Sequence, residues 1–150
     1  IRKLQIQWDR IVPNWRKHTK GKIMKKNYLL LLLTSFVVAD PELYFIEPQD
    51  GKTYSTEVSV KFGLKDFGVA PAGYNIPNTG HHHLIINAEL PDLTLPIPAN
   101  ENYVHFGLGQ TETNLSLEPG TYTLQLLMGN YLHIPHEKPL FSKVISITVE

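Results

Sequence analysis

The chain has 150 residues, of which 42% are hydrophobic and none is cysteine. That length suits one domain of ordinary size, and a chain without cysteine cannot form disulfides, zinc–thiolate sites or iron–sulfur clusters or use thiol catalysis. The formal net charge of zero is the sum of two opposed regions. Residues 1–39 carry nine Lys/Arg and one Asp, whereas residues 40–150 carry five Lys, no Arg and thirteen Asp/Glu. The acidic region is not expected to bind nucleic acid, because phosphate neutralisation needs clustered Lys and Arg.

Residues 24–39 have the three-part pattern of a secretory signal peptide. A short basic region begins at Met24, an apolar run with five consecutive leucines covers residues 28–38, and Ala39 precedes a predicted cut before Asp40. The run has about half of the roughly 20 apolar residues that a membrane-spanning helix needs. This favours a cleaved signal over a retained anchor or a buried helix. We expect a periplasmic or secreted bacterial protein with no stable membrane span after cleavage.

Residues 1–23 precede the candidate start methionine and are mostly polar and basic. A signal peptide with such an extension would be unusual, so we interpret this stretch as translated upstream DNA. A disordered basic N-terminal arm is the alternative. In both cases the fold is expected from residues 40–150 alone, as a single domain.

Residues 40–150 are predicted to be all-β, because polar and apolar residues alternate and no segment keeps a helical period. About seven short strands separated by Pro and Gly favour an immunoglobulin-like β-sandwich. Loops are expected over residues 66–80 and 90–102, and loops this long in a small sandwich are often functional. Strands are predicted at residues 43–46, 57–64, 83–87, 115–117, 121–128 and 142–149.

The turn at Glu118-Pro119-Gly120 leads into the longest predicted strand. Tyr122 follows it, as at the start of strand F in immunoglobulin-like folds, where a tyrosine hydroxyl bonds to the corner before the strand. The alternative is that Tyr122 simply faces the core or the solvent.

Six of the seven histidines lie after residue 40, and three of them are consecutive, His81 to His83. Imidazole is a common ligand for zinc and copper, and it binds in its neutral form. Side chains alternate between the two faces of a strand. His81 and His83 are therefore predicted to share one face, while His82 points to the other.

Two further segments carry imidazoles. His105 lies near a predicted strand end, and the turn His133-Ile134-Pro135-His136 places two imidazoles three residues apart. If the fold brings these segments to one end of the sandwich, three or four histidines could bind one ion. The candidate metal ligands are His81, His83, His105, His133 and His136, with His82 and Glu112 as additional candidates.

Cu(II) is the first expected metal and Zn(II) the second, since an all-imidazole site suits both and Cu(II) stands highest in the affinity order. Two other roles remain open for the histidines. They could brace the long loops through hydrogen bonds, or they could act in catalysis.

Enzyme motifs are not found: the chain has no nucleophile elbow, no nucleotide-binding glycine loop and no HExxH pattern. Glu112 could act as a base near His105, but a solvated strand residue is the favoured interpretation. We therefore expect a binding module rather than an enzyme. The alternative is an envelope structural module, or a protein or ligand interaction module, whose histidines brace the loops.

Several motifs together resemble one bacterial secreted family, catalogued as domain of unknown function 4399. Two positions depart from the family pattern: Asn87 stands where an acidic residue is frequent, and Asn130-Tyr131 where an Asp-His pair is common. The resemblance implies a small exported β domain and no established activity. Its motifs are Phe67 to Gly73, Asn78 to Leu84, His105 to Glu112, Leu126 to Gly129 and His133 to His136.

Overall fold

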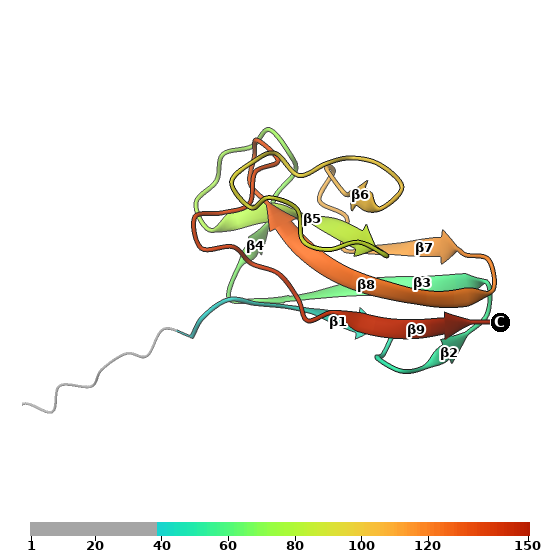
Figure 1. The fold of residues 1–150 in the computed structure, drawn as a ribbon. Helices are drawn as coiled ribbons and strands as arrows, with labels where there is room; N and C mark the ends of the chain where they lie inside the picture. Colours follow the sequence, from blue (N-terminus) through green and yellow to red (C-terminus); the bar gives the residue numbers. More distant parts are fainter. Residues whose placement is uncertain (1–38) are drawn as a thin grey trace, which may run out of the picture. The chain divides into compact units, whose positions relative to one another are not determined.

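A computed structural model describes residues 39–150, which form two β-sheets with a shared core (Figure 1). The described residues contain no helix, so they include none that could cross a membrane. The strands are β1 (Glu42–Glu47), β2 (Thr53–Tyr54), β3 (Glu57–Lys65), β4 (Gly68–Val69), β5 (Thr79–Ile86), β6 (Tyr103–His105), β7 (Glu112–Ser116), β8 (Gly120–Gly129) and β9 (Ile145–Val149).

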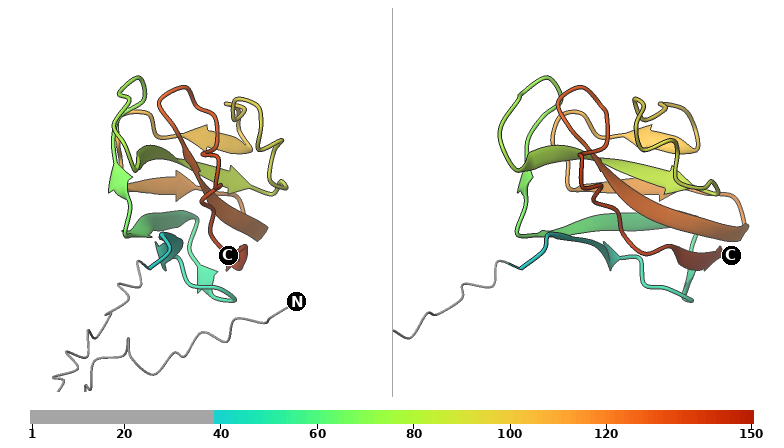
Figure 2. Two further views of the ribbon diagram at one scale, coloured as in Figure 1. Left: turned by 90° about the vertical axis from the view of Figure 1, so that its left-hand side faces the viewer. Right: turned by 60° about the vertical axis from the view of Figure 1, so that its left-hand side comes forward.

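The smaller sheet has the order β1-β3-β7, and both of its pairs are antiparallel. The larger sheet has the order β2-β9-β8-β5-β4, and β6 pairs with the free part of β5. Figure 2 shows the two layers, with β5 and β8 crossing the molecule in one layer and β1 and β3 in the other. Strand β5 is thus the element from which the larger sheet extends toward β8, β4 and β6.

The main core lies between the sheets and follows from the alternation of apolar residues along the strands. Val58 and Val60 of β3 are fully buried against Leu84 of β5 and Leu126 of β8. Leu84 and Leu126 are register partners in the larger sheet. Burial of such side chains is the main favourable term in folding.

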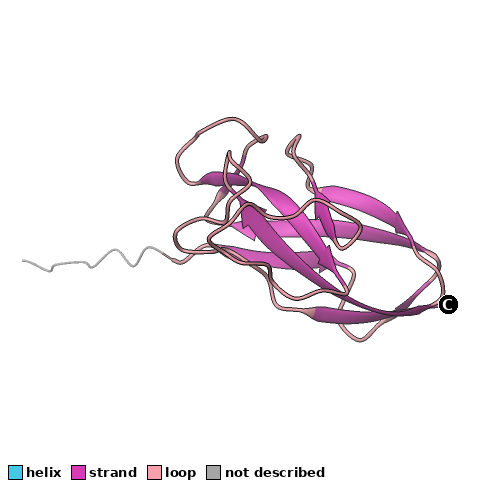
Figure 3. Cartoon of the chain, turned by 45° about the horizontal axis from the view of Figure 1, so that its top comes forward, coloured by secondary structure: helices cyan, strands magenta, loops and turns pink. Residues whose placement is uncertain are grey.

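A second, smaller core lies on the outer face of the larger sheet. Ile85 of β5 and Leu127 of β8 are fully buried there against Ile97, which belongs to the loop over residues 90–102. Strand β5 is therefore buried on both faces, which explains its nearly continuous buried pattern. Figure 3 shows loops arching over one face of these strands. The same outer face carries the histidine cluster described below.

The all-β architecture and the six predicted strands are confirmed, with shifts at their ends. Strand β5 begins at Thr79 rather than at residue 83, because the histidine triplet itself pairs with β8. Strand β9 begins only at Ile145, because the Ser142 hydroxyl, not a backbone carbonyl, accepts the hydrogen bond from the Leu126 N–H. The short strands β2, β4 and β6 were not predicted; β4 lies inside the expected loop over residues 66–80.

Of the two interpretations left open for Tyr122, the structure has the corner. Its hydroxyl donates a hydrogen bond to the backbone carbonyl of Glu118 at 2.9 Å, four residues upstream. This contact fixes the turn before β8. Residues 24–38 of the predicted signal peptide, like the proposed boundary between residues 23 and 24, lie outside the described residues. Residues 39–150 fall within one compact unit.

Candidate metal centre

Three separate segments bring imidazoles to the outer face of the larger sheet. Strand β5 contributes His81 and His83, β6 contributes His105, and the turn after β8 contributes His133. The register of the sheet sets two of these positions, because His83 pairs directly with His105. His81 and His105 are 24 positions apart in the chain, and His105 and His133 are 28 positions apart. The fold brings all three together.

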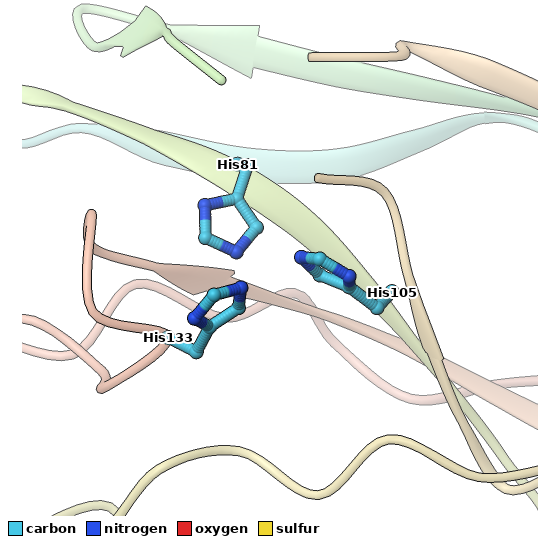
Figure 4. Close-up of side chains that lie close together, drawn as sticks. All are labelled: His81, His105 and His133. Atoms are coloured by element: carbon cyan, nitrogen blue, oxygen red, sulfur yellow. The ribbon is translucent and has the colours of Figure 1, made fainter. Parts of the chain in front are cut away.

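The ring geometry is that of a tight cluster (Figure 4). One candidate ligand atom from each of His81, His105 and His133 lies within 4.8 Å of the others. The ring centroids are 4.9 Å apart for His81 and His105, 5.0 Å for His81 and His133, and 4.6 Å for His105 and His133. His83 stands next to this group, with its Nε2 atom 3.0 Å from Nε2 of His81.

His133 is held by an unusual turn. Its φ of 63° lies in the left-handed region, which non-glycine residues seldom adopt. The Asn130 Oδ1 atom accepts hydrogen bonds from the backbone N–H groups of Leu132 and Ile134, on both sides of His133. The His133 carbonyl accepts the Ile97 N–H at 2.7 Å, which ties the turn to the loop over residues 90–102. Asn130 is therefore a positioning residue for His133.

Glycines make room for the rings. A Cβ atom at Gly129 would lie 2.9 Å from Nε2 of His83 and 3.3 Å from Nε2 of His81. A Cβ atom at Gly107 would lie 2.6 Å from Nε2 of His105. Both distances to the nearest nitrogen are closer than real Cβ contacts, so any larger residue would displace the imidazoles.

Burial leaves several ring nitrogens without hydrogen-bond partners. His81 and His83 are 0% and 1% exposed, and the Nδ1 atom of each is buried and unpaired. The Nε2 atom of His105 is also buried and unpaired, although its ring is half-buried overall. A buried polar atom without a partner is costly. The hydrogen bond between His81 and His83 therefore does not satisfy all of the buried ring nitrogens. A metal ion is one kind of partner that could bind them.

The electrostatics keep these rings neutral. Burial, reinforced by neighbouring histidines, lowers the pKa of His81 to about 4 and that of His83 to about 3. The pKa of His105 is lowered by burial and by His133. The neutral form carries the free lone pair that binds a metal ion. At neutral pH His81, His83 and His105 are therefore in the form that can bind a metal ion.

Three of the candidate residues lie outside this cluster. His82 points into the main core, as the alternation along β5 predicts: its ring stacks on Phe62 at 4.9 Å, and its Nδ1–H donates to the Gln110 carbonyl at 3.2 Å. His136 packs edge-on against Phe67 at 5.1 Å, beside the cluster rather than in it. Glu112 is exposed at the start of β7, in the other sheet.

The three imidazoles suit a first-row transition-metal ion that prefers nitrogen ligands. Zn–N bonds of about 2.0–2.1 Å place tetrahedral ligands about 3.3 Å apart. The ligand atoms are up to 4.8 Å apart, so the rings must move together by about an ångström to bind one ion. His105 and His133 can do this more easily than a core residue, because they are partly exposed and lie on a short strand and in a turn. The ligand roles of the individual histidines remain predictions.

Sequence reasoning missed the supporting residues Gly107, Gly129 and Asn130. Part of the signal was in the sequence: a glycine stands two residues after His105, and another stands four residues before His133. Their role depends on which ring lies over each backbone, and that requires the tertiary structure.

A search of curated proteins found no significant match. Among solved structures, the endo-beta-1,4-mannanase from Thermotoga petrophila is similar over 78% of this chain, with 17% sequence identity and a TM-score of 0.47. The chain spans only 21% of that enzyme, and the likeness carries no argument about function. The model of the family described as "Domain of unknown function (DUF4399)" matches residues 60–150, which include all three segments of the cluster. The chain therefore belongs to the DUF4399 family.

Proposed function

We propose that this protein is a small exported binding module whose histidine cluster binds one transition-metal ion. The observation that carries the proposal is the meeting of His81, His105 and His133 from three separate segments, at a place where buried ring nitrogens lack hydrogen-bond partners. Lowered pKa values for His81 and His105 hold these rings in the neutral form that a metal requires. His83, in contact with His81, is the candidate fourth ligand.

Cu(II) and Zn(II) are the metals this ligand set suits best. An all-nitrogen imidazole site fits both ions, and Cu(II) stands highest in the affinity order for such ligands. Three protein ligands with a further position open would be typical of a reactive zinc site. Because no carboxylate is among the groups that shift the pKa of His81, His83 or His105, we propose binding rather than catalysis.

The alternative is a structural or interaction module in which the histidines brace the loops. The hydrogen bond between His81 and His83, and the backbone bond from Ile97 to His133, favour this alternative. It does not account for the unpaired ring nitrogens of His81, His83 and His105. We therefore place it second.

Two further parts of the proposal concern the setting of the site. We infer an immunoglobulin-like fold, because the orders β1-β3-β7 and β5-β8-β9 correspond to the A-B-E and C-F-G arrangements of that fold. We also infer export to the periplasm or medium, on the strength of the signal pattern in residues 24–39.

Titration calorimetry on chelator-treated protein tests the metal proposal. The parent should bind one equivalent of Cu(II) or Zn(II), and His81→Ala and His133→Ala should each weaken binding by a large factor. His82→Leu is the matched control, because this residue sits on the same strand but faces the core. If the parent binds no ion more tightly than a disordered histidine-containing peptide does, the bracing alternative replaces the metal proposal.

A further inference from the structure

We propose that the ion in this site takes a small exogenous anion as an additional ligand. This inference rests on the proposed function and specifies what the bound ion would in turn bind. It follows from the charges around the cluster, which the metal proposal did not use.

Each histidine of the cluster lies in a segment that carries no acidic or basic side chain other than histidine. These segments cover residues 67–88, 102–111 and 119–136. They build β4 and β5, β6 with the loop after it, and β8 with its following turn. The protein therefore offers neutral ligands in a neutral setting.

No carboxylate in the described part of the chain shifts the pKa of His81, His83 or His105. The charges that affect the pKa values of His81 and His83 all belong to other histidines. Of the acidic residues that border the three segments, Asp66 and Glu137 line a groove beside His136, and the others are exposed. Those others are Glu89, Glu101, Glu112 and Glu118.

A divalent ion held by neutral imidazoles keeps its full double charge. A charge in a poorly solvated place is costly unless it is paired. An ion at this site would lie against His81 and His83, which are fully buried, so water would solvate it poorly on that side. The same effect acidifies water on zinc held by three histidines, to a pKa of about 7, because an anionic ligand offsets the charge. Here a small anion from solution would offset the charge of the ion, in place of a carboxylate side chain.

The anion also has a way in and a place to bind. The rings of His105 and His133 are only half-buried, so the cluster faces solvent on their side. Three histidine ligands leave at least one coordination position open on a four-coordinate ion. If His83 is the fourth ligand, the anion takes a fifth position, since such sites can expand from four to five ligands.

The experiment uses azide, a small anion whose binding to Cu(II) produces a charge-transfer absorption band. The full-length chain is loaded with one equivalent of Cu(II), stoichiometry is checked by metal analysis, and azide is titrated at fixed pH. We expect a saturable band with one azide per copper. His82→Leu should give the same titration, because His82 lies on the far side of the sheet.

A matched pair of variants tests the charge argument itself. His83→Asp places a carboxylate against His81 while the other three rings remain, so azide affinity should fall by about tenfold or more. His83→Asn has the same shape without the charge and should retain azide binding. Equal azide affinities in the two variants would refute the charge argument.

The two proposals fail in different ways. Copper that binds stoichiometrically without any azide band, even at large excess, would overturn the anion inference and leave the metal proposal standing. Failure to bind copper at all would overturn the metal proposal itself. The parent titration decides the inference even if His83→Asp does not fold.

Discussion

His82 should make the metal-free protein sensitive to acid. It is fully buried between the sheets, and burial lowers its pKa to about 4, against a hydrogen bond to the Gln110 carbonyl that raises it. Because that carbonyl is an acceptor, Nδ1 carries the ring proton, and the buried Nε2 has no partner. Protonation would add an N–H donor there with nothing to accept it.

The sign and size of the effect follow from this pKa. Between pH 6.5 and about 4 the unfolded chain binds a proton at His82 and the native protein does not, so the free energy of unfolding falls as the pH falls. At 1.36 kcal/mol per pH unit, the step from pH 7 to pH 4.5 should cost about 2 kcal/mol from this residue. His81 and His83 shift in the same direction. The total would be a large part of a typical stability of about 5–15 kcal/mol.

Urea unfolding of the chelator-treated chain, followed by circular dichroism at pH 7 and pH 4.5, measures this loss. His82→Leu should lose about 2 kcal/mol less than the parent over the same pH interval. Leu126→Ala is the control, because it should lower stability equally at both pH values. If His82→Leu and the parent have the same pH dependence, His82 is not buried in its neutral form and the reasoning is wrong.

Three other substitutions probe the core, the site and the corner. Leu126→Ala removes a fully buried side chain from the main core and should cost about 2–5 kcal/mol of unfolding free energy in urea titrations. Gly107→Ala should push His105 aside and weaken metal binding in calorimetry, whereas Gly120→Ala, whose nearest Cβ contact is an ordinary 3.6 Å, should bind like the parent. Tyr122→Phe removes the corner hydrogen bond and should cost about 1 kcal/mol, seen as a lower urea midpoint; an unchanged midpoint would mean that the corner does not need it.

The sequence was informative where a local rule applied. Alternation along a strand predicted that His81 and His83 share a face and that His82 does not, and the ring contacts agree. The motif around Tyr122 indicated the corner contact as one of two alternatives, and that contact is present. Both features depend on residues a few positions apart, for which the geometry of the backbone is known in advance.

The rest depended on pairings that no local rule gives. The cluster exists because His83 stands opposite His105 and because the turn after β8 folds back over β5. His136, only three residues from His133, points instead toward Phe67. Spacing along the chain could not separate these two histidines, because a left-handed backbone at His133 redirects the turn between them.

The wide separation of the ligands along the chain has a consequence for stability. An ion joining His81, His105 and His133 would close two chain loops, of 24 and 28 residues by their numbering. A disulfide closing a loop of that length reduces unfolded-chain entropy by an amount worth about 3.5 kcal/mol, and this chain has no cysteine with which to form one. The unfolded chain presents the same rings far apart, so the ion would favour the native state almost exclusively. In a domain without disulfides, the metal would then act as a reversible cross-link. Its contribution to the free energy of unfolding would depend on the concentration of free ion around the protein.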